Sequence, residues 1–215
     1  MCWSAEADLV AGVCVAAVGA ACVARADRSR DLPLAALPLL LGAHQMIEAA
    51  VWASDGGTGP AVLLWAVVAL PLLPLLALWV PVGVWCAAPH PARRALIVPL
   101  AAGAVTAPAL GYVLATRPVR AEVRGHTVGY VLDLPHAPLA AVGYLVATVG
   151  ALLLSGDRGL RTLGALAAAG ALVCWALWRL EFVSTWCAFA ALCSLALFGW
   201  VRGRPPARPG PDGTR

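Results

Sequence analysis

The sequence predicts an all-α membrane protein, a seven-transmembrane-helix bundle with a short extracytoplasmic β-hairpin between helices four and five. Its composition supports this class, because 61% of the 215 residues are hydrophobic and only 12% are charged, whereas a soluble domain carries about 25% charged residues. Several charge-free runs reach the roughly 20 residues that a helix needs to cross about 30 Å of hydrocarbon. These runs are continuously apolar rather than alternating, which argues against a transmembrane β-barrel.

Seven spans follow from the apolar runs and from the polar or turn-forming residues between them. In chain order we expect them at 9–24, 32–53, 61–85, 95–116, 137–155, 161–178 and 184–201. The third span contains Pro71, Pro74 and Pro81, and should bend because proline removes a backbone donor. Only RLEFVS separates the last two spans, but a single helix over both would be about 60 Å long. We therefore predict a tight helical hairpin there.

The segment 117–136 is expected to form the hairpin and to pack on the helix ends like a lid. Apolar and charged residues alternate over 119–124, and a second alternation follows Gly125, which is the pattern of two paired strands. We divide the chain into a seven-helix transmembrane domain, 1–202, and a Pro/Gly/Arg-rich cytoplasmic tail, 203–215, which we expect to be disordered.

The distribution of arginine predicts the orientation in the membrane. All 15 basic residues are Arg, and the seven spans would place eleven of them on one side and four on the other. Positive loops face the cytoplasm, so we expect a plasma-membrane protein with its N-terminus outside and its C-terminus inside. The eleven are Arg25, Arg28, Arg30, Arg93, Arg94, Arg158, Arg161, Arg202, Arg204, Arg208 and Arg215.

Three polar residues interrupt the apolar run LLLGAHQMIEAAVWA in the second span: His44, Gln45 and Glu48. His44 and Glu48 are four residues apart and share a helix face, which Trp52 extends. Ionisable groups at such depth are costly and usually face a bundle interior or a water-filled cavity. Because further polar residues fall at the outer level, we expect an outward-opening pocket beneath the hairpin. Its candidate ligand-binding residues are Ser4, His44, Gln45, Glu48, Trp52, His126, Arg179 and Glu181.

Each group of candidate residues also has a purely structural explanation. His44, Gln45 and Glu48 could hold the helices together through interhelical hydrogen bonds. Arg179 and Glu181 could form an ion pair in a solvated turn. Acidic residues near the start of the first span, Glu6 and Asp8, would favour the helix N-terminus through its dipole.

Several short motifs resemble an uncharacterised family of bacterial multipass membrane proteins that open with Met-Cys-Phe-Ser-Ala. The matching pieces are MCWSA at the start, HQMIE at 44–48, RGHTVGY at 124–130, DLP at 133–135 and FVSTWC at 182–187. Trp3 stands where the family has Phe, and Ala49 stands where it has Gly. The resemblance implies a seven-helix membrane protein and no established activity.

Three functions compete. The pocket could bind or transport a small polar ligand, a cation or a proton, since buried Glu and His change protonation with their surroundings. The chain could instead be a structural or assembly subunit without a ligand. Thirdly, His44 and Glu48 could hold a metal ion in a membrane-embedded hydrolase, with a third ligand from His126, Asp133 or His136. In each case the lipid bilayer is the expected partner and nucleic acid is not.

Two cysteines combine shallow depth with the oxidising side of the membrane. Cys2 precedes the first span, and Cys187 lies in the first turn of the seventh. Disulfides persist on that side, so a Cys2–Cys187 bridge is predicted as an alternative to two unpaired interfacial residues.

Overall fold

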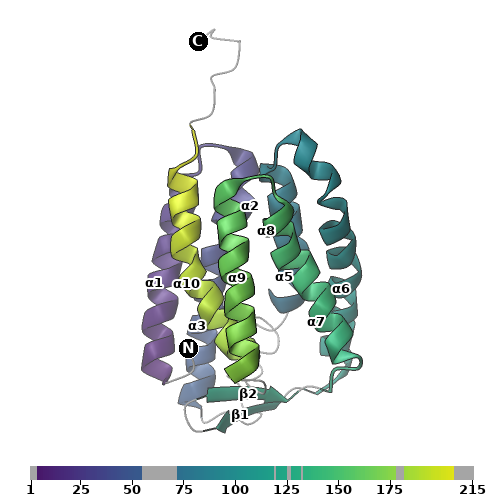
Figure 1. The fold of residues 1–215 in the computed structure, drawn as a ribbon. Coiled ribbons are helices and arrows are strands. Elements are labelled where there is room, and N and C mark those ends of the chain that lie inside the picture. Colours follow the sequence, from purple (N-terminus) through teal and green to yellow (C-terminus); the bar gives the residue numbers. More distant parts are fainter. Residues whose placement is uncertain are drawn as a thin grey trace.

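Figure 1 shows a bundle of helices that run side by side, in a computed structural model that describes residues 4–54, 72–118, 120–124, 127–131, 133–177 and 182–205. The first helix begins at the end of the bundle where two short strands lie, which we call the strand end. The last helix finishes at the opposite end, where the arginines of the inter-helix turns lie, and which we call the arginine end.

The first helix, α1 (Ala5–Ala24), begins four residues before the predicted span. The reason is its cap: the Ser4 hydroxyl accepts a hydrogen bond from the backbone N–H of Ala7 at 3.1 Å, which satisfies an otherwise unpaired donor of the first turn. As a result Asp8 lies inside the helix rather than in front of it.

The chain returns through η1 (Ser29–Asp31), α2 (Leu32–Ala35) and α3 (Leu37–Ala53), which together form one apolar stretch over Ser29–Ala53. The next described elements are α5 (Leu72–Ala87), η3 (His90–Arg94) and α6 (Ile97–Thr116). Because the predicted third span starts at 61, its first part lies outside the described residues.

Two strands, β1 (Arg120–Arg124) and β2 (Thr127–Val131), pair antiparallel within the segment whose alternation indicated them. Arg120 lies opposite Val131, and Arg124 lies opposite Thr127. An ion pair between Arg117 and Asp133 joins the two chain segments that lead into and out of the strands. The strands cross the strand end of the bundle in Figure 1, and β2 packs against the last helix.

The next apolar helix is interrupted by a wide turn. It consists of α7 (Ala137–Leu145), the π-helical segment η4 (Val146–Gly150) and α8 (Ala151–Leu154). No residue of α7 is buried, whereas Ala147, Thr148 and Val149 in η4 are. The buried face therefore begins where the π turn begins.

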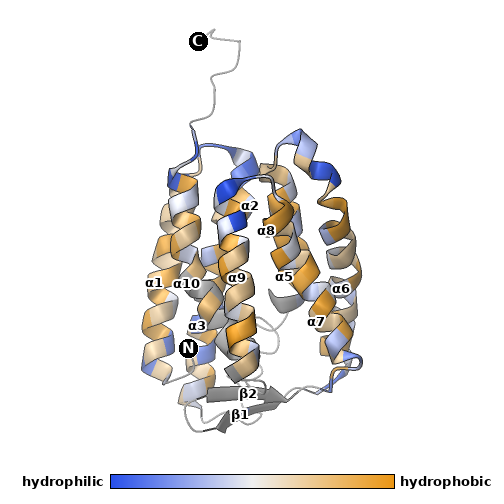
Figure 2. Cartoon of the chain, in the orientation of Figure 1, coloured by the Kyte–Doolittle hydropathy of each residue, from blue (hydrophilic) through white to orange (hydrophobic). Residues whose placement is uncertain are grey.

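The chain closes with α9 (Arg158–Leu177) and α10 (Phe182–Arg202), which pack against each other and run in opposite directions. This confirms that the chain turns between the predicted sixth and seventh spans. Five helical segments in the described ranges are long and apolar enough to cross a membrane, which confirms the membrane class: Ala5–Ala24, Ser29–Ala53, Ile97–Thr116, Ala137–Leu154 and Arg158–Ala176. Figure 2 shows hydrophobic helices with hydrophilic residues gathered toward the turns.

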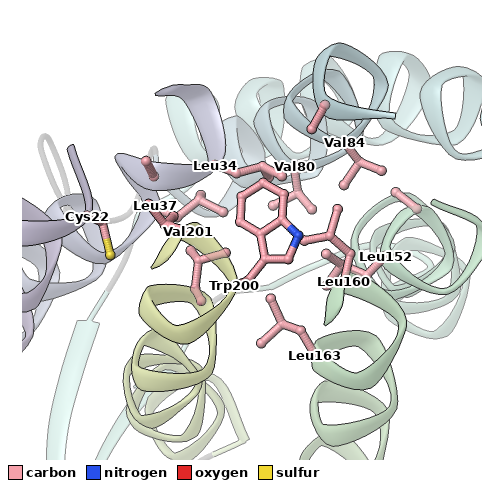
Figure 3. Close-up of a cluster of buried hydrophobic side chains, with 14 of the residues drawn as sticks. Cys22, Leu34, Leu37, Val80, Val84, Leu152, Leu160, Leu163, Trp200 and Val201 are labelled. Carbon is pink, nitrogen blue, oxygen red and sulfur yellow. The ribbon is translucent and has the colours of Figure 1, made fainter. Parts of the chain in front are cut away.

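The largest apolar core lies toward the arginine end. Trp200 of α10 stands at its centre, surrounded by side chains from α2, α5, α8 and α9 (Figure 3). Its labelled members are Cys22, Leu34, Leu37, Val80, Val84, Leu152, Leu160, Leu163, Trp200 and Val201. Burial of these large apolar side chains stabilises the packing of the helices against one another at the arginine end.

A polar clasp centred on Arg204 covers this core. Its guanidinium donates two hydrogen bonds to Asp31, at 3.1 and 2.9 Å, and a third to Asp157 at 3.1 Å. It also donates to the Ala87 carbonyl and stacks on the Trp200 ring at 4.6 Å. The prediction that Arg204 belongs to a disordered tail is therefore wrong, because its guanidinium joins α10 to three other parts of the bundle. Residues 206–215 lie outside the described residues.

Candidate functional site

A seam of small residues brings α1 and α3 unusually close together. Gly12 of α1 faces Gly42 of α3, and Gly19 of α1 lies against Pro38 and Leu39 of α3. A methyl group added at Gly42 would come within 2.6 Å of the Ala16 backbone nitrogen. Small residues permit this backbone approach in membrane helices. This close contact sets the relative positions of α1 and α3. It therefore determines which side chains of the two helices lie opposite each other nearer the strand end.

Asp8 continues the α1 face toward the strand end, one helical turn before Gly12. Its side chain is fully buried, although the sequence analysis gave it only a role at the helix terminus. The spacing from Asp8 to Gly12 is i, i+4 and therefore marks one face. That spacing is the sequence signal that indicates its inward position.

The opposing face of α3 carries the predicted polar residues. His44 is 2% exposed, Gln45 is 1% exposed and Glu48 is 0% exposed. All three side chains are therefore buried, while their role in binding a ligand stays a prediction. Their low exposure places these side chains inside the bundle, where α3 packs against α1 and α10.

Asp8 and Glu48 lie near each other in the bundle. The two carboxyl groups interact electrostatically, and the Trp52 indole lies beside Asp8. Trp52 is half-buried at the end of α3, so it covers the cluster from the strand end. We call Asp8, His44, Gln45, Glu48 and Trp52 the carboxyl cluster.

The cluster has the composition of a site for a positive charge. Two fully buried carboxyl groups repel each other when both are ionised, and low-dielectric surroundings strengthen that repulsion. A bound proton or cation relieves it. The neighbouring Gln45 side chain offers an amide oxygen as a further ligand.

The structure brings together only part of the predicted site. Ser4 caps α1 with its exposed side chain, at the same end of the bundle as the cluster. His126, Arg179 and Glu181 lie outside the described residues, so their place in a pocket stays a prediction.

The predicted metal ligands His44 and Glu48 lie one turn apart on α3, as their spacing required. Within the described ranges, no three His, Cys, Asp or Glu side chains are arranged to hold a metal ion. Asp133, one of the candidate third ligands, is instead paired with Arg117.

The predicted Cys2–Cys187 bridge stays a prediction, since Cys2 and the side chain of Cys187 lie outside the described part. Five described cysteines are free: Cys14, Cys22, Cys86, Cys174 and Cys193.

A family model, described as a family of unknown function and designated DUF6629, matches residues 1–212. The chain belongs to this family. The match covers nearly the full sequence and agrees with the resemblance to an uncharacterised family that the short motifs carried. In this DUF6629 member both the carboxyl cluster and the Arg204 clasp fall within the matched residues. No curated protein and no solved structure matches the chain.

Proposed function

We propose that this chain is a seven-span plasma-membrane protein of bacterial origin that binds a proton or a small cation at the carboxyl cluster. The observation that carries the proposal is the proximity of two fully buried carboxyl groups, Asp8 and Glu48, on two apolar helices. Ionisable residues at such positions in membrane proteins commonly mark ion or proton pathways.

The depth of the cluster supports access from one side only. Glu48 lies five residues, or about 7.5 Å, from the end of α3 at 1.5 Å per residue. Asp8 is three residues, or about 4.5 Å, from the start of α1. The apolar core toward the arginine end contains none of these groups, so the nearer exit is toward the strands, which would act as the lid of the site.

The nature of the groups favours a cation over an anion. Two carboxyl groups and an amide oxygen are ligands for hard cations, and the imidazole of His44 is a group that can bind a proton. A purely structural cluster would also be buried, and a binding experiment separates the two possibilities.

We expect Asp8→Asn and Glu48→Gln to abolish stabilisation of the purified protein by its cation, or to remove a protonated carboxyl band from its infrared spectrum. A ligand present at 100 times its Kd stabilises a protein by about 2.7 kcal/mol, which is easily measured by thermal unfolding. Sodium, potassium and calcium chlorides would be compared with choline chloride at constant ionic strength, in nanodiscs of neutral lipid.

The matched control is Glu6→Gln, because Glu6 is exposed on the same helix only two residues from Asp8. The Glu6→Gln variant should show the same stabilisation by cations and the same protonated carboxyl band as the wild-type protein. If neither a cation effect nor a protonated carboxyl distinguishes the wild type from the Asp8→Asn/Glu48→Gln double variant, the cluster is structural and the proposal fails.

The proposed orientation places the strand end outside and the arginine end in the cytoplasm, in line with the arginines around η1, η3 and the ends of α9 and α10. Alkaline phosphatase, which is active only outside the cytoplasm, should therefore be active when fused after Ser54 and inactive when fused after Pro205. The reverse pattern would contradict the orientation.

A further inference from the structure

We propose that the phosphate headgroup of an anionic phospholipid binds at a pocket at the arginine end, between the end of α1 and the end of α10. The pocket is a shallow depression open to its surroundings, with a volume of about 10 Å³, enough for one water molecule. The phosphate would therefore lie over its opening, against the guanidinium groups, rather than inside it. Its charged lining residues are Arg25, Asp27, Arg28, Asp31 and Arg204. This site is separate from the carboxyl cluster, which lies toward the opposite end of the bundle.

The charges of the pocket are unevenly matched. Arg204 is held by Asp31 and Asp157, two carboxylates for one guanidinium. Among the described residues, Arg25 has no carboxylate partner; its guanidinium instead stacks on the Phe198 ring at 5.5 Å. Its positive charge is therefore available to an anion at the pocket.

The guanidinium group of Arg202 adds a second positive charge near the pocket. Arg202 stacks on the same Phe198 ring at 5.7 Å and is exposed. Within the described part of the chain, Arg202 has no ion pair either. The aromatic ring thus holds two like charges near each other, and an anionic group between α1 and α10 would relieve their repulsion.

The height of the pocket favours a lipid as the source of the phosphate. Arg25 follows directly after 20 helical residues of α1, which span about 30 Å of hydrocarbon. Its guanidinium therefore lies at the level of the headgroups. Farther into the bilayer, α1 and α10 expose apolar side chains such as Val13 and Leu195, which suit acyl chains. Basic pockets between membrane helices commonly bind anionic headgroups in this way.

The test is native mass spectrometry of the full-length protein, titrated with phosphatidylglycerol and with phosphatidylcholine. The wild type should retain phosphatidylglycerol selectively. Arg25→Gln should weaken it about fivefold, since one Arg near a membrane surface contributes about 1 kcal/mol. Arg25→Lys, which keeps the charge, should retain most of the binding and shows that any loss in Arg25→Gln is electrostatic.

The matched control is Arg94→Gln, which removes the same charge at the same end of the bundle. Arg94 is exposed in η3, beside α6, and does not line the pocket; Figure 1 places α6 on the opposite side of the bundle from α1. If Arg25→Gln and Arg94→Gln lose phosphatidylglycerol binding to the same extent, the proposal is overturned, because the lipid would then be attracted by the general positive charge of this end and not by the pocket. Inorganic phosphate at millimolar concentration that displaces the lipid and stabilises the protein equally would also overturn it, in favour of a soluble phosphate ligand.

Discussion

Replacing Arg204 with methionine should lower the free energy of unfolding by about 3 kcal/mol, because breaking a buried ion pair leaves an uncompensated charge behind. Asp31 would lose both of its hydrogen bonds from the guanidinium while its side chain is only 3% exposed. The same contact raises the pKa of Arg204 above its usual value, so the guanidinium is charged throughout the accessible pH range. Equilibrium unfolding in mixed micelles, followed by tryptophan fluorescence, measures the loss.

The control for this prediction is Arg202→Met, because Arg202 is two residues from Arg204 in sequence yet exposed to solvent. Its described contact is the cation–π interaction with Phe198, which contributes about 0.5–1 kcal/mol at an exposed site. If Arg204→Met lowers the free energy of unfolding as little as Arg202→Met does, the contacts of Arg204 do not hold the helix ends together.

Replacing Gly42 with alanine should destabilise the protein by about 1–3 kcal/mol, the usual cost of forcing an extra methyl group into a packed interface. The new carbon would lie 2.6 Å from the Ala16 nitrogen and 2.7 Å from the Gly12 carbonyl oxygen. Both are backbone atoms of α1, which cannot rotate away, so the two helices must separate. The carboxyl cluster lies between the same two helices. Separating them should therefore also weaken the stabilisation by cations, or the protonated carboxyl band, that we expect of the wild type.

Gly199→Ala provides the comparison, since Gly199 lies within α10 and an added methyl group there meets no atom within 4 Å. Alanine favours a helix over glycine by about 1 kcal/mol, so this variant should be as stable as the wild type or more so. A stable Gly42→Ala protein with an unchanged cluster would contradict the role given to the seam.

The sequence predicted the membrane class and the buried face of α3 because both depend on local signals. Charge-free runs indicate spans, and the spacing of His44 and Glu48 places them on one face whatever the neighbouring helix is. The strand segment followed from alternation, which is also local. The start of α1 was missed by four residues because the apolar run was measured from Leu9, although Ser4 is a good helix cap.

The partners of the buried groups could not be predicted, because they come from other parts of the chain. Asp8 faces Glu48 only because the glycines of α1 and α3 permit close contact, and no local pattern pairs the two helices. Arg204 follows the last helix in a Pro-rich stretch that resembles a flexible tail. Its partners Asp31 and Asp157 are 173 and 47 residues away in sequence.

The π turn at 146–150 also affects how sequences of related proteins should be aligned. A π turn holds one residue more than the α-helical turn it replaces, and here it separates an exposed half-helix from a buried one. A relative that lacks one residue in this segment could keep every buried contact of Ala151 and Leu152 while the half that begins at Ala137 rotates about the helix axis. A one-residue gap at this point would then record a change in the surface that faces the lipid, with the protein interior conserved.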